Sequence, residues 1–180
     1  MKYLRITLSL LFAISLFLTS CGSEDEGDDP TATNEPPFFE VTVSGTKYEA
    51  NFTGTNPPLF GALVSPANNL TSITLTGTTT GGGSIGLLVG YIGSGTGSYT
   101  LTSAPGEGGN PLEGLSFFLT TDGADESTDY EAVNINLNIT SYNALASTFA
   151  VVEGSFSGTV LDSDDNQVQV SGSFRTSNND

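Results

Sequence analysis

Apolar and polar residues alternate with a period of two along most of the chain after residue 37. This period is typical of β-strands that bury one face. The clearest run alternates Val133, Ile135, Leu137 and Ile139 with three asparagines. We therefore predict a strand with one buried face and one face in water at this place in the chain.

Similar runs recur along the domain, and short clusters of Gly, Pro, Asn and Asp separate them. The runs contain Phe39, Val41 and Val43; Ile73 and Leu75; Val152, Gly154, Phe156, Gly158 and Val160; and Val168, Val170, Gly172 and Phe174. Only Tyr142 to Thr148 could form a helical turn, and such a short helix is marginal by itself. The pattern predicts an all-β fold, either an antiparallel β-sandwich or a partly closed barrel of about 8–10 strands.

The first residues have a different pattern, with Lys2 and Arg5 ahead of an apolar run from Ile6 to Leu18. A bilayer-spanning helix needs about 20 apolar residues, so this run has the length of a signal-peptide core instead. Leu18-Thr19-Ser20-Cys21 resembles the lipobox of bacterial lipoproteins, and Cys21 is the only cysteine of the chain. We expect residues 1–20 to be removed and Cys21 to carry the lipid that anchors the protein to a membrane.

Charge divides the rest of the chain into a tether and a domain. After Cys21 there are 20 acidic residues and two basic ones, Lys47 and Arg175, so the expected mature charge is 2 − 20 = −18. Such a surface repels phosphate backbones, which excludes nucleic acid as a partner. Residues 21–37 are acidic and proline-rich, as in a flexible tether, and residues 38–180 have the length of one domain.

The amino-acid composition of the chain excludes several classes of catalytic site. The chain has no His, and its one thiol is the expected lipidation site, so Ser-His-Asp catalysis, Cys-His catalysis and zinc sites of His and Cys are excluded. Glycoside hydrolysis needs only two carboxylates and stays open, with Glu49, Glu107, Glu113, Glu131 and Glu153 as candidates. None of them lies in an apolar run that would raise its pKa, so we expect no enzyme.

Two acidic loops are candidate calcium sites. Asp162, Asp164, Asp165 and Asn166 bring carboxylate and amide oxygens together, and Asp122 to Asp129 form the second loop. Calcium takes six to eight oxygen ligands. The same residue types also make hairpin turns, and the turn is the favoured interpretation. We expect no other cofactor.

Two resemblances extend this picture to a location. Ser23-Glu24-Asp25-Glu26 resembles the surface-export signal of Bacteroidota lipoproteins, which implies the outer face of the outer membrane rather than its periplasmic face. The domain is similar to uncharacterised outer-membrane lipoproteins of that phylum with a small β-rich domain of unknown function. The matching pieces are Val41 to Gly45, Tyr48 to Ala50, Gly97 to Leu101, Gly154 to Gly158 and Val168 to Phe174.

The expected function is that of a non-catalytic binding or interaction module for a glycan or a protein. Tyr91, Tyr99, Tyr130 and Tyr142 could stack on sugars in this chain without Trp, although core packing is the commoner role of such residues. The alternative is a structural subunit that assembles through sheet edges, with Val168 and Val170 in an edge strand. A carboxylate-based glycoside hydrolase is the least favoured hypothesis.

Overall fold

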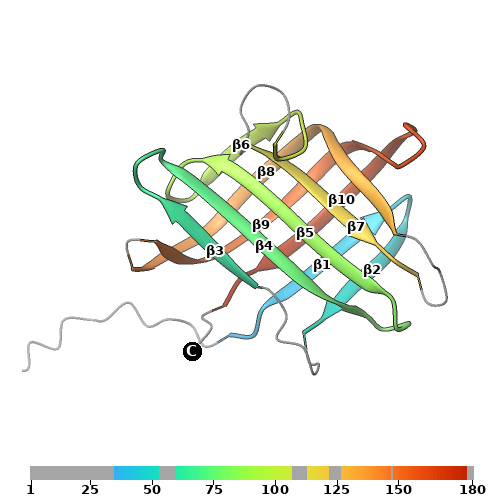
Figure 1. The fold of residues 1–180 in the computed structure, drawn as a ribbon, viewed down its shortest axis with the longest axis horizontal. Coiled ribbons are helices and arrows are strands. Elements are labelled where there is room, and N and C mark those ends of the chain that lie inside the picture. The colour runs from blue at the N-terminus through green and yellow to red at the C-terminus, as the bar shows by residue number, and fades with distance from the viewer. Residues whose placement is uncertain (1–34, 53–59, 107–112, 122–126, 147, 178–180) are drawn as a thin grey trace, which may run out of the picture. The chain divides into compact units, whose positions relative to one another are not determined.

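The computed structural model describes residues 35–52, 60–106, 113–121, 127–146 and 148–177 as an antiparallel β-structure (Figure 1). The strands are β1 (Phe38–Val43), β2 (Thr46–Asn51), β3 (Phe60–Ser65), β4 (Leu70–Thr79), β5 (Ser84–Ile92), β6 (Gly97–Leu101), β7 (Gly114–Leu119), β8 (Thr128–Ala146), β9 (Phe149–Leu161) and β10 (Gln167–Arg175). The described residues contain no helix, which confirms the all-β prediction. The marginal helical turn that Tyr142 to Thr148 could have formed is absent from the described part of this segment, because β8 continues to Ala146 and pairs there with β9.

The sheet closes on itself. Its strand order is β2-β1-β10-β9-β3-β4-β5-β7-β8-β6, and two further pairings join β2 to β4 and β9 to β8. A closed ring therefore runs through β1, β2, β4, β5, β7, β8, β9 and β10. Each strand of this ring pairs with its neighbours in sequence once β3 and β6 are set aside, which is the topology of an up-and-down barrel. Of the two predicted architectures, the structure has the barrel.

The two remaining strands, β3 and β6, continue the lines of β2 and β7 in the barrel wall and do not extend an edge of the sheet. β2 and β3 both pair with β4, at Asn51↔Thr78 and Phe60↔Leu75, so they lie along β4 as two parts of one interrupted strand. β7 and β6 both pair with β8, at Ser116↔Glu131 and Leu101↔Ile135. The barrel wall therefore contains two interrupted strands.

These interruptions divide the barrel into a wide and a narrow half. At the wide end lie the β1–β2, β4–β5 and β9–β10 turns; at the narrow end lie the β3–β4 and β5–β6 turns, the end of β8 and the start of β9 (Figure 1). β1 and β10 end midway along the barrel. There β10 lies beside β9, and the buried Thr176 donates its N–H to the Val152 carbonyl and accepts a hydrogen bond from the Val152 N–H with its hydroxyl. We call this place the seam. Beyond this seam β3 pairs directly with β9, at Ala62↔Ala150. The narrow half is thus lined by β3, β4, β5, β6, β8 and β9.

The interior is filled by the apolar side of the alternating pattern. The Phe156 ring lies 6.5 Å from Phe39 and 6.4 Å from Phe117, centroid to centroid. Fully buried residues from every strand of the ring except β2 join them: Val41, Ile73, Leu75, Ile85, Val89, Leu115, Ile135, Leu137, Val152, Val160 and Phe174, among others. An eight-stranded barrel is just wide enough for side chains to fill, so this interior is a packed core.

Glycines make room for two of these rings. Phe174 lies opposite Gly154 and Phe156 lies opposite Gly172 in the β9–β10 ladder. A Cβ on Gly154 would come within 3.0 Å of the Phe174 ring, and one on Gly172 within 2.5 Å of the Phe156 ring. Gly154-Ser155-Phe156 and Gly172-Ser173-Phe174 therefore share a Gly-x-Phe pattern that packs each ring over the glycine of the neighbouring strand.

One detail of the predicted central strand is wrong. The register of β8 against β9 shifts between Ala132 and Asn134, so Val133 is the extra residue of a bulge. Ala132 is buried in its place, while Ile135, Leu137 and Ile139 face the core as predicted. The described part of the chain contains no helix long and apolar enough to cross a bilayer.

Candidate ligand-binding pocket

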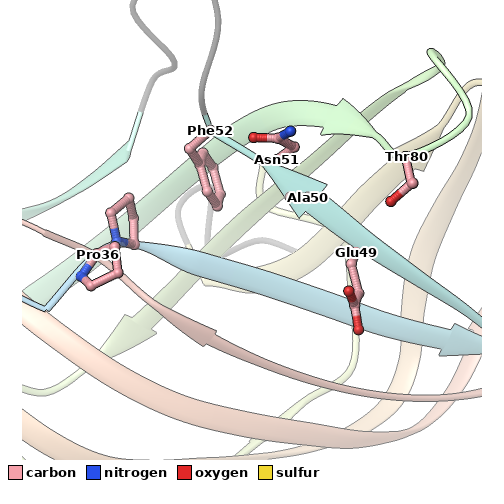
Figure 2. Close-up of a pocket in the computed structure, with 7 residues that line it drawn as sticks. Pro36, Glu49, Ala50, Asn51, Phe52 and Thr80 are labelled. Carbon is pink, nitrogen blue, oxygen red and sulfur yellow. The ribbon is translucent and has the colours of Figure 1, made fainter.

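A pocket opens on the outside of the barrel at the seam, where β2 ends (Figure 2). Its volume is about 500 Å³. The lining residues come from the start of the described chain, from β2 and from the turn after β4: Pro36, Pro37, Glu49, Ala50, Asn51, Phe52 and Thr80. Because side chains fill the interior, a pocket for a ligand is expected on the surface of the wall, as here at the end of β2.

The pocket has an apolar and a polar side. Figure 2 shows the Phe52 ring and Pro36 on one side, and Glu49 and Thr80 on the other. Asn51 lies between them on β2. The alternation of β2 explains the arrangement, because Glu49 and Asn51 are exposed whereas Ala50 and Phe52 pack against the core. Apolar walls with a few polar groups are typical of sites for small ligands.

The carboxylate of Glu49 belongs to a charged group that spans β1 and β2. Lys47 Nζ lies 2.7 Å from Glu49 Oε1 and 2.7 Å from Glu40 Oε2. Ser173 Oγ donates to Glu40 Oε1 at 2.9 Å. The hydrogen bonds from Lys47 and then Ser173 hold the pKa of Glu40 below its ordinary value, and the two carboxylates raise the pKa of Lys47.

A second charged group fixes the segment that carries the prolines. Arg175 Nε donates to Glu153 Oε2 at 3.1 Å, and the same guanidinium pairs with Glu35. Its Cζ also lies 5.1 Å from the centre of the Phe38 ring. Glu35 to Pro37, which the sequence assigns to the tether, are thus held against the barrel next to Phe52.

The structure separates most of the carboxylates that the sequence proposes for glycoside hydrolysis. Glu49 lines the pocket, Glu153 pairs with Arg175, Glu131 is exposed on β8 and Glu113 precedes β7; Glu107 lies outside the described residues. Glu49 is brought together with Glu40, a carboxylate outside the proposed set, which lies directly opposite it in the β1–β2 ladder. Their equal distance from Ser44-Gly45, the turn between the two strands, could have identified this pair from the sequence.

The four tyrosines proposed for sugar stacking all point into the barrel. Tyr91 is fully buried, and Tyr99 packs on it with ring centroids 4.5 Å apart. Tyr130 stacks on Phe117 at 4.6 Å, and Tyr142 is half-buried opposite Val152. None of the four lines the pocket, whose aromatic residue is Phe52. Phe52 does not stand out in the sequence as a site residue, because its position at the end of a strand resembles a core position.

The first candidate calcium loop forms a hairpin turn. Asp162 Oδ1 accepts hydrogen bonds from the backbone N–H groups of Asp164 and Asn166, both at 2.9 Å. These bonds and the Asn166 side chain lower the pKa of Asp162. Asp165 has a positive φ of 62°. The geometry therefore supports the turn interpretation.

The second acidic loop is described only at its end. There the backbone N–H of Asp129 donates to Ser163 Oγ at 3.0 Å, so the two loops meet at the wide end. Within the described residues no three acidic, His or Cys side chains are close enough to hold a metal ion. Asp122, Asp125 and Glu126 lie outside those residues, as do Cys21 and the Ser23, Glu24, Asp25 and Glu26 tract.

No protein-family model, curated protein or solved structure matches the chain. The functional argument therefore rests on the chemistry of the site, because a barrel by itself supports many functions.

Proposed function

We propose that the chain is an outer-membrane lipoprotein of the cell surface, anchored through Cys21, whose barrel is a non-catalytic binding module. The lipobox-like sequence before Cys21 and the acidic tract after it support the anchor and the location. The pocket at the seam supports the binding role. The ligand we propose is a glycan.

The observation that carries the glycan proposal is the pairing of an apolar wall with hydrogen-bonding groups in one open pocket. Phe52 and Pro36 offer a surface for the C–H face of a sugar ring. Glu49, Asn51 and Thr80 offer a carboxylate, an amide and a hydroxyl for the sugar hydroxyls. Sites for small ligands combine these two features.

The charges near the pocket favour binding over catalysis. A glycosidase needs one carboxyl group whose pKa is raised so that it can donate a proton. Here the pKa of Glu40 is lowered, and Lys47 holds both Glu40 and Glu49 as partners. This arrangement supports a site that positions a ligand by hydrogen bonds.

The alternative of assembly through β10 has less support. β10 pairs with β1 along one side and with β9 along the other. Replacing Val168 or Val170 by Pro would therefore break the barrel wall, and it cannot test an assembly edge.

Binding is tested by titrating ¹⁵N-labelled mature chain, with Cys21→Ser, against a panel of neutral oligosaccharides. We expect chemical-shift changes confined to Glu49, Asn51, Phe52 and Thr80. Phe52→Ala and Glu49→Gln should each weaken binding about tenfold, the effect of roughly 1.4 kcal/mol. Glu131→Gln, an exposed acid on β8, is the matched control and should bind as the parent does. Shifts elsewhere, or equal loss in the control, would refute the proposed site.

Anchoring is tested separately in cells. Metabolic labelling with a fatty acid should mark the parent chain and leave Cys21→Ser unlabelled. A labelled Cys21→Ser chain, or an unlabelled parent, would refute the anchor.

A further inference from the structure

The narrow half of the barrel carries no charged residue. Neither the sequence from Ala50 to Gly106 nor that from Ala132 to Val152 contains Asp, Glu, Lys or Arg. These two stretches supply β3, β4, β5 and β6 entirely, together with the parts of β8 and β9 that lie beyond the seam. The ion pairs of the described residues lie on β1, β2, β9 and β10 and on Glu35 just before β1.

The same half carries a group of exposed apolar side chains. Leu63 is 56% exposed, Phe149 52%, Ile92 46% and Leu145 39%. Leu63 and Phe149 lie directly opposite each other across β3 and β9, so their side chains are neighbours on the outer face. Leu145 lies on β8 between Ala144 and Ala146, whose partners are Ala150 and Phe149. We call Leu63, Ile92, Leu145 and Phe149 the collar.

The collar contrasts with the rest of the wall. Outward positions elsewhere include long polar runs, as in Asn134, Asn136 and Asn138 on β8. The other large exposed apolar residue of the described chain, Leu88, lies on the same face of β5 as Ile92. Apolar side chains gathered at one end of a polar surface mark an interaction site.

We propose that the collar seats in the interface of the lipid bilayer that anchors the chain, with the acidic wide end facing away. The proposal rests on the proposed anchoring at Cys21. An uncharged end enters a lipid interface without the cost of dehydrating ions. The wide end, with Asp129, Asp162, Asp164 and Asp165, would instead be repelled by anionic headgroups.

A second copy of the chain is a poorer occupant. A stable protein interface buries about 800 Å² on each partner, and four partly exposed side chains supply only a fraction of that area. Contact with a bilayer needs a smaller buried area. The lipid anchor already holds the domain at a high local concentration beside the membrane, so weak insertion is enough.

The chain path allows this orientation. β1 runs from the seam toward the wide end, so the segment before Phe38 leaves the barrel on the narrow side of β1. The residues between Cys21 and Glu35 can span up to roughly 45 Å when extended. The six residues of β3, which lead from the seam to the narrow end, span about 20 Å.

The absence of Trp from the chain allows a direct test. The mature chain is coupled through its only thiol, Cys21, to a maleimide lipid in phosphatidylcholine vesicles that contain brominated acyl chains. Single-Trp variants report the two ends: Phe149→Trp and Ile92→Trp in the collar, and Gln167→Trp, an exposed residue near the wide end, as the control. Both collar probes should shift to the blue and lose roughly half of their emission, because interfacial side chains sit about 5–10 Å into the headgroup–acyl boundary.

The control probe should keep its emission. Unquenched collar probes, or a control quenched as strongly as they are, would overturn the proposal. So would a mature chain that sediments as a dimer before coupling and becomes monomeric with Phe149→Ser, since the collar would then bind a second copy. Chemical coupling replaces lipidation by the cell, so a failure of anchoring in cells leaves this result unaffected.

Discussion

At the scale of single residues, Tyr91 is the one described side chain whose buried polar atom has no hydrogen-bond partner. It faces Thr71 across β4 and β5. The hydroxyl of Thr71 does not donate to the Tyr91 hydroxyl, because it donates to the Gly93 carbonyl at 2.7 Å. Burial raises the pKa of Tyr91. An unsatisfied buried hydroxyl costs about 1–3 kcal/mol.

Tyr91→Phe should therefore stabilise the domain by about 1 kcal/mol, because it removes the unpaired hydroxyl and keeps the ring that packs on Tyr99. Urea unfolding of the mature chain measures this change. Thr71→Val is the matched control and should destabilise the domain by about 1 kcal/mol, since it loses a real hydrogen bond. A clear loss of stability in Tyr91→Phe would show that the hydroxyl has a partner.

At the scale of strands, glycine and aromatic residues are matched across the ladders. Gly86 on β5 lies opposite Phe118 on β7, and a Cβ on Gly86 would come within 2.2 Å of the Phe118 ring. The ring therefore covers the glycine on the outer face, as in other sheets where an aromatic side chain shields a strand glycine. Within the glycine-rich stretch from Gly77 to Gly97, Gly86 is therefore the position where a missing side chain lets the Phe118 ring approach the backbone.

Gly86→Ala should cost about 1 kcal/mol, because the Phe118 ring must swing into water. In a Phe118→Ala background the same change should be neutral or stabilising, since alanine loses less backbone entropy than glycine. Unfolding free energies of the four proteins complete a double-mutant cycle. Additive effects would show that the ring and the glycine do not interact.

At the scale of the whole molecule, charge is unevenly distributed. The chain has 20 acidic and four basic residues, and two of the basic residues precede Cys21. At the wide end, Asp162, Asp164 and Asp165 lie in the β9–β10 turn and Asp129 and Glu131 lie at the start of β8, whereas the narrow half is uncharged. Self-repulsion at the wide end therefore opposes folding.

Added salt should stabilise the mature chain. Screening weakens the ion pairs of Lys47 and Arg175, which are partly exposed and contribute little, and it weakens the repulsion among the many acids more. We expect the melting temperature to rise by about 2–5 °C between low salt and 0.5 M NaCl, a change of up to roughly 1 kcal/mol. Calorimetry measures the shift, and a fall would mean that the ion pairs outweigh the repulsion.

The sequence by itself determined the elements that depend on local pattern. Period-two alternation located the strands around Phe39, Ile73, Val152 and Val168, and turn residues located the hairpins, because the inward or outward direction of a side chain is set by its position along the strand. The lipobox-like segment and Cys21 are read from sequence alone and stay predictions.

The tertiary structure decided the features that depend on which strands meet. Closure of the barrel joins β2 to β4 and β8 to β9, and alternation cannot specify it, because the same strands could form two stacked sheets. The bulge at Val133 arises from the register against β9. The pocket beside Phe52 and the collar of Leu63 and Phe149 exist because β1 and β10 end midway and β3 pairs with β9, and distant segments meet there only after the chain has folded.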